Sequence, residues 1–87
     1  MVMANEQKLV AKLTATPTPT DFRWSELESL LGKLGFEQRT GSGSRRKFFH
    51  SETKCLISLH EPHPKPILKP YMIKDIVSKL REHGFLS

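Results

Sequence analysis

Two stretches of the chain place hydrophobic residues at the spacing of an amphipathic helix. In the first, over residues 24–34, the residues that form one apolar stripe are Trp24, Leu27, Leu30, Leu31 and Leu34. Gly35 follows at the position where a glycine commonly ends a helix. In the second, over residues 71–84, the side chains expected to face inward are Ile73, Ile76, Val77 and Leu80, and Gly84 ends the helix.

Between these helices the pattern changes to short runs typical of strands. They are FEQR (36–39), RKFFH (46–50) and CLISLH (55–60). The turns GSGS (41–44) and 51–54 are of hairpin length, so the strands pair antiparallel. The sequence therefore predicts an α+β fold: a small α-β-β-β-α domain with a three-stranded antiparallel sheet and both helices on one face.

Strand alternation predicts which side chains face the helices. In the third strand Cys55, Ile57 and Leu59 are the more apolar set and are expected to face the core, which leaves Leu56, Ser58 and His60 on the opposite, open face. Phe48 and Phe49 are neighbours and must also divide between the faces. The Phe on the open face then stacks a base or packs on a partner, unless the N-terminal segment covers it.

The N-terminal 20 residues differ in composition from the rest of the chain. Residues 1–13 contain a short helical pattern with Asn5 as a candidate N-cap and Leu9, Val10 and Leu13 on one side. So short a helix forms only if it packs against the domain. TATPTPT (14–20) predicts an extended linker, because alternating proline disfavours a helix. We expect an extension at residues 1–20 and a domain at 21–87.

Charge and cysteine content narrow the classes of function. Lys and Arg outnumber Asp and Glu by 14 to 9, for a net charge of +5, which favours an anionic partner such as nucleic acid, an acidic protein or a membrane surface. The single Cys55 excludes an internal disulfide and a cysteine-rich zinc module. No stretch reaches the roughly 20 apolar residues of a membrane span, and no signal-peptide core is present, so we expect a cytoplasmic protein with no membrane partner.

The order of these elements resembles the HicA family of toxins. The resemblance rests on LGF at the end of the first helix, on the Gly-Ser-rich turn, and on the span SLHEPHPKPILKPYMIKDIVSKLREHGF. It implies a double-stranded-RNA-binding-like (dsRBD-like) fold, and the toxin of a type II toxin–antitoxin system that binds and cleaves mRNA without a metal or other cofactor. It also implies a HicB-like antitoxin as partner. The family has a catalytic His after Gly-Ser, where this chain has Arg45.

Histidines are the residues best suited to metal-free RNA cleavage, because an imidazole serves as acid or base near neutral pH. We select His60 and His63 as the catalytic candidates; His50 ends the neighbouring strand, and His83 suits an interaction at the helix C-terminus. HEPH (60–63) lacks enough further ligands for zinc, and its prolines indicate a stiff loop, so no metal site is expected.

The candidate RNA-binding residues are basic and lie on the turn, the proline-rich loop and the last helix: Arg45, Arg46, Lys47, Lys65, Lys69 and Lys74. Two other interpretations stay open. Arg45 in place of the catalytic His favours a non-catalytic module of the same fold that binds RNA or a protein. A weaker alternative is a DNA-binding module whose last helix places Lys69, Lys74 and Lys79 roughly along one side.

Overall fold

The apolar stripes form helices where their spacing predicts. The computed structural model describes residues 2–41, 43 and 45–86, so Met1, Ser42, Ser44 and Ser87 lie outside the described residues. The described chain forms three helices: α1 (Val2–Leu13), α2 (Trp24–Lys33) and α3 (Pro70–Glu82).

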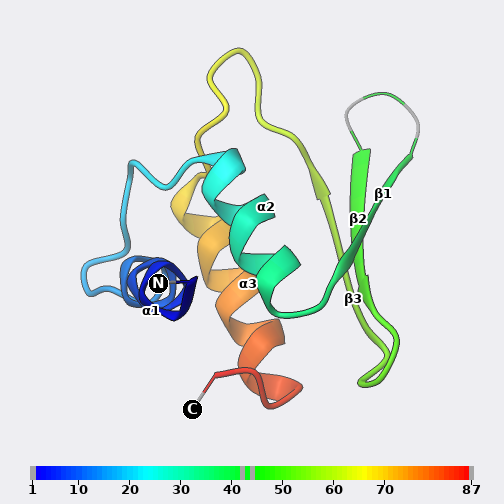
Figure 1. Ribbon diagram of the computed structural model, residues 1–87. Coiled ribbons are helices and arrows are strands. Elements are labelled where there is room, and N and C mark those ends of the chain that lie inside the picture. The colour runs from blue at the N-terminus through cyan, green and yellow to red at the C-terminus, as the bar shows by residue number, and fades with distance from the viewer. Residues whose placement is uncertain (1, 42, 44, 87) are drawn as a thin grey trace.

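The three predicted strands pair as one antiparallel sheet in the order β1-β2-β3. Their bounds are β1 (Glu37–Thr40), β2 (Arg45–His50) and β3 (Cys55–His60). At the first turn the Gly41 N–H donates to the Arg45 carbonyl oxygen over 2.9 Å and closes the hairpin. The helices all lie on one side of the sheet (Figure 1), so the predicted α+β architecture is confirmed.

The core lies between the sheet and the α2–α3 pair. Its sheet side consists of Phe48, Cys55 and Ile57, all buried, while Leu59 packs against them with partial burial. The helix side comes from the predicted stripes, and Trp24 meets Phe48 with ring centroids 5.7 Å apart. The inward set predicted for the third strand is therefore confirmed, and Phe48 is the phenylalanine that enters the core.

Gly35 ends α2 in a conformation that few other residues adopt. Its φ is +97°, in the left-handed region, as the C′ position after a helix requires. A side chain there would also meet the His50 ring, since a Cβ built on Gly35 lies 3.1 Å from His50 Nε2. The turn from α2 into β1 thus needs glycine both for its backbone angle and for space.

The N-terminal helix packs on the outer side of the helical layer. In Figure 1 α1 lies beyond α2 and α3, away from the sheet, so it does not cover the open sheet face. Phe49 on that face stays half-buried. Leu13 is only 1% exposed and belongs to the core, with Leu9 and Val10 packed against it. The prediction of Asn5 as N-cap is wrong, because the helix begins three residues earlier, at Val2.

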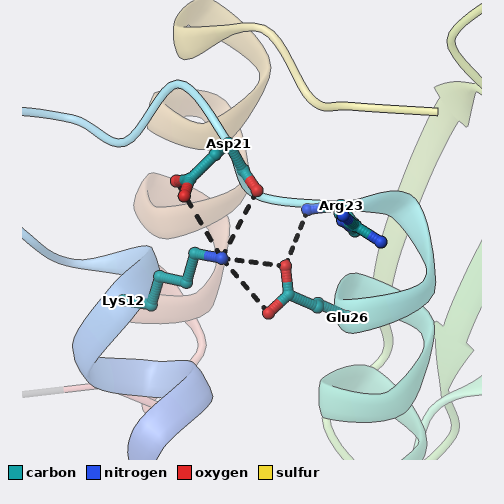
Figure 2. A network of polar contacts seen from close by, with 4 residues as sticks. All are labelled: Lys12, Asp21, Arg23 and Glu26. Atoms are coloured by element: carbon teal, nitrogen blue, oxygen red, sulfur yellow. Dashed lines mark hydrogen bonds and ion pairs between the residues drawn. The ribbon is translucent and has the colours of Figure 1, made fainter. Parts of the chain in front are cut away.

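A network of polar contacts joins α1 to the start of α2 (Figure 2). Lys12 Nζ donates to both carboxylate oxygens of Glu26, at 3.0 and 3.3 Å, and to the Asp21 carbonyl oxygen at 3.3 Å. Glu26 also accepts the backbone N–H of Arg23 over 2.9 Å, so its carboxylate caps the first turn of α2 as well. One carboxylate therefore holds both the extension and the helix start.

The Glu26 network predicts a pH dependence of stability. Burial alone would raise the pKa of Glu26, but the Arg23 N–H and the Lys12 ammonium outweigh it and hold that pKa below 4.5. Because the folded-state pKa is the lower one, the stabilisation is fully present above pH 4.5 and is lost as the pH falls through the folded-state value. We expect Glu26→Gln to be less stable than wild type at neutral pH and to lose less stability on acidification.

Urea unfolding followed by circular dichroism across this pH range measures both effects. The matched control is Glu52→Gln, on the exposed turn between β2 and β3, which should follow the wild-type curve. Equal pH dependence in wild type and Glu26→Gln would show that this carboxylate does not hold α1 in place.

The proline-rich loop from residue 61 to 69 is anchored at its second half. Ile67 forms an antiparallel bridge with Arg23, and the N–H groups of Trp24 and Leu68 donate to Pro66 and Phe22 carbonyls, each over 2.8 Å. Leu68 is buried in the core at 1% exposure. These contacts fix the path of the second half of the loop into α3.

Candidate functional site

Strand pairing places Arg45 and His60 beside each other on the open face of the sheet. Because Phe48 points into the core, alternation puts Arg45, Lys47 and Phe49 on the other side of β2. In the β2–β3 register Arg45 lies opposite His60, and Lys47 lies opposite Ser58. Directly paired residues have Cβ atoms about 5 Å apart, so the arginine and the imidazole share one patch of surface.

A groove runs from this patch to the beginning of α3. It has a volume of about 410 Å³ and lies between the end of β3, the first part of the proline-rich loop and α3. The side chains with acid–base or charged groups that line it are His60, Glu61, His63, Lys69, Tyr71 and Asp75. The structure thus brings the two predicted catalytic histidines together with one predicted RNA-binding lysine.

The basic triplet at residues 45–47 divides between the two faces. Arg46 turns away from Arg45 and Lys47, and its Nη2 lies 3.4 Å from Glu61 Oε1. Its Nη1 donates to the carbonyl oxygens of Gly43 and Arg45, each over 3.0 Å. Arg46 therefore ties the end of the hairpin to the loop after His60 and offsets the charge of Glu61, while Arg45 and Lys47 remain exposed on the open face.

The other predicted RNA-binding lysines lie in different places. Lys65 is exposed on the loop, whereas Lys74 lines a second groove of about 380 Å³ between α3 and the segment after α1. Lys79 lies on yet another side of α3, beside β3. The prediction that Lys69, Lys74 and Lys79 lie along one side is wrong, because five helical residues turn the chain by about 140°. This removes the main support for the alternative of a DNA-binding module in which α3 enters a groove of the DNA.

His50 and His83 have neighbours that give each a structural role. His50 pairs with Cys55 at the opposite end of the sheet from His60, and its ring packs against both Phe36 and Phe85 with centroids 5.3 and 4.8 Å away. Its Nδ1 accepts the Thr53 N–H over 3.3 Å. His83 Nδ1 lies 3.1 Å from the Lys79 carbonyl oxygen, as predicted for a histidine that ends α3.

Cys55 is fully buried in the core, as predicted, and burial raises the pKa of its thiol. Among the side chains that the structure describes, no group of three His, Cys, Asp or Glu residues is placed to hold a metal ion. Within the same residues, no helix has the length and apolar content needed to span a bilayer.

Two residues of the groove were missed by sequence reasoning. Tyr71 and Asp75 stand one helical turn apart near the start of α3 and line the same groove as His60. Tyr71 carries the one signal that was available, since it is a large aromatic residue outside the apolar stripe of its helix. Nothing local to Asp75 distinguishes it from other solvated helix residues.

Comparison with known families supports the resemblance to the HicA family that the sequence motifs indicated. A family model described as "HicA toxin of bacterial toxin-antitoxin" matches residues 24–85. Neither a search of curated proteins nor a search of solved structures finds a match. The family match begins at the first residue of α2, includes the whole sheet and ends beyond α3, and the chain therefore belongs to the HicA family of toxins from bacterial toxin–antitoxin systems.

Proposed function

We propose that this toxin acts in the cytoplasm by binding mRNA and cutting it without a metal, and that a HicB-like antitoxin neutralises it. The observation that carries the proposal is the β2–β3 register, in which His60 lies directly opposite Arg45. Arg45 occupies the position where the family has its catalytic histidine, so an imidazole is still present on the same face, one strand away.

The groove supplies the groups that metal-free RNA cleavage needs. In this reaction the 2′-oxygen attacks the adjacent phosphorus while a base takes its proton, and the bond from phosphorus to the 5′-oxygen breaks while an acid protonates that oxygen. The products are a 2′,3′-cyclic phosphate and a 5′-hydroxyl. We assign His60 on β3 as the base and His63 on the loop as the acid, since both line one groove.

Positive charge near these histidines stabilises the transition state of cleavage. Arg45 is the nearest cation on the open face by strand pairing, and Lys69 lines the same groove at the residue before α3. A guanidinium suits the extra charge on the phosphorus oxygens because its planar fork binds two of them. Lys47, next to Ser58 on the open face, extends the basic surface along the path of an RNA backbone.

A non-catalytic binding module remains the second candidate. Arg45 itself favours it, because an arginine cannot act as the acid or base that the family's histidine provides. Phe49 and the 44%-exposed Leu56, paired across β2 and β3, also give the open face an apolar patch suited to a protein partner. This module would bind RNA or a protein and leave transcripts intact.

The first test is expression of the full chain alone. We expect growth arrest with loss of mRNA, because an acid–base pair in one groove cuts RNA without further components. Purified protein should also cleave a transcript equally fast with Mg²⁺ and with excess EDTA, since no step uses a metal. Normal growth with stable transcripts at verified expression favours the binding module, and cleavage that stops in EDTA refutes the histidine mechanism.

A further inference from the structure

Tyr71 is a large aromatic side chain held out in solvent beside the proposed cleavage site. It is 64% exposed, and among the described residues the other exposed large hydrophobic side chain is Leu56 on the sheet. Tyr71 is the second residue of α3, directly after Pro70, so its backbone position is well defined. The ring makes no hydrogen bond or ring contact with the described part of the chain.

Asp75 adds an acidic side chain to the groove beside Tyr71. Tyr71 and Asp75 are four residues apart in α3, so they lie on the same helical face one turn apart, and both line the groove. Glu61 in the same groove is paired with Arg46, but no described side chain forms an ion pair with Asp75. An unpaired carboxylate repels phosphate and accepts hydrogen bonds, so Asp75 suits the amino group of a base, whereas Lys69 in the same groove suits the phosphate.

We infer that Tyr71 and Asp75 form a subsite for one unpaired nucleobase next to the scissile phosphate. Tyr71 stacks on the face of the base, and the Asp75 carboxylate accepts a hydrogen bond from its amino group. This inference rests on the proposed function, and it adds a substrate class: single-stranded RNA with a cytosine, adenine or guanine at this place.

Stacking on Tyr71 and hydrogen bonding to Asp75 select the RNA for different physical reasons. A base within a duplex has both faces covered by its neighbours, so an aromatic side chain stacks only on a base in single-stranded RNA. A carboxylate favours bases with an exocyclic amino group, as when Asp or Glu accepts from cytosine N4. Uracil has no amino group, and its one N–H lies between two carbonyl oxygens, which the carboxylate repels. The subsite therefore discriminates against uracil.

The test measures binding of RNA analogues that cannot be cut. In short 2′-O-methyl oligocytidine and oligouridine the attacking 2′-hydroxyl is blocked, and fluorescence anisotropy of labelled strands gives their affinities for the full chain. We expect wild type to prefer oligocytidine to oligouridine, and both to a duplex of equal length. Tyr71→Ala should weaken oligocytidine binding about fivefold or more, as for the loss of one stacked base, whereas Tyr71→Phe should stay near wild type.

Asp75→Ala tests the other half of the subsite. It should remove the preference for oligocytidine and bind oligouridine at least as tightly as wild type, because the repulsive charge is gone. The inference is overturned if Tyr71→Ala binds oligocytidine within about twofold of wild type. It is also overturned if the same variant keeps its RNA affinity but loses binding to an antitoxin, which would make Tyr71 a protein contact.

A cleavage assay separates failure of the proposed function from failure of the subsite. An unmodified RNA is incubated with wild type in parallel with the binding measurements. Tyr71-dependent binding without cleavage supports the subsite and refutes the nuclease proposal. Cleavage combined with Tyr71-independent binding refutes the subsite and leaves the nuclease proposal in place.

Discussion

His60→Ala is expected to abolish growth arrest and to slow RNA cleavage by the purified protein by a factor of about 10²–10⁴, the usual contribution of an acid or base. RNA affinity should change little, because Arg45, Lys47 and Lys69 still present their charges. His60 is exposed on the open face and lies outside the core, so the unfolding free energy should fall by no more than about 1 kcal/mol.

The matched control is His83→Ala. It also removes a histidine ring, but at the C-terminal end of α3, whereas the groove lies at the N-terminal end of this helix. His83 does not line the groove, and its Nδ1 contacts the Lys79 carbonyl oxygen, so the His83→Ala protein should still cleave RNA. His50→Ala is unsuitable as a control, because the His50 ring packs against two phenylalanines. A folded His60→Ala protein that cleaves within about threefold of the wild-type rate would show that His60 is not the catalytic base.

The two faces of the sheet were predictable because successive side chains of a strand point to opposite faces. In β3 three of the four apolar residues, Cys55, Ile57 and Leu59, occupy alternate positions, and a strand with one buried face has only one register that buries all three. Alternation alone therefore places His60 on the open face. Arg45 follows from the same argument once Phe48, and not Phe49, is assigned to the core, a choice between neighbours that the local pattern left undecided.

The charge pairs and ring contacts were not predictable because they join distant segments. Arg46 looked like its neighbours in sequence, yet the anchored loop brings Glu61 to it at 3.4 Å. His50 looked like a solvated strand end, yet Phe36 and Phe85 come together around it only when β1 and the end of α3 are in place. Hydrophobic periodicity carries no information on such contacts.

The groove lies at the junction of three segments, and sequence supplied only some of its residues. His60 and His63 stood out because histidine is a natural acid or base, whereas Tyr71 and Asp75 gain meaning only from the side of α3 that faces the groove. The docking of α1 was open for the same reason. A short helix is stable only through its tertiary contacts, and those depend on the shape of α2 and α3.

Leu13→Ala is expected to have the largest effect on stability of any change at residues 7–20 of the N-terminal extension. Leu13 is 1% exposed within the core, and truncation of a buried leucine to alanine usually lowers the unfolding free energy by about 2–5 kcal/mol. That is a large share of the roughly 5–15 kcal/mol that holds a domain together. Urea unfolding at neutral pH measures the difference.

Lys8→Ala is the control, because it makes the same alanine in the same helix at an exposed position and should stay within about 0.5 kcal/mol of wild type. The comparison also tests the predicted boundary between residues 20 and 21. If both variants unfold like wild type, the extension is an appendage and the domain at 21–87 is stable without it. If only Leu13→Ala is destabilised, the last residue of α1 is part of the toxin core, and a chain that begins at Asp21 should be less stable than the full protein.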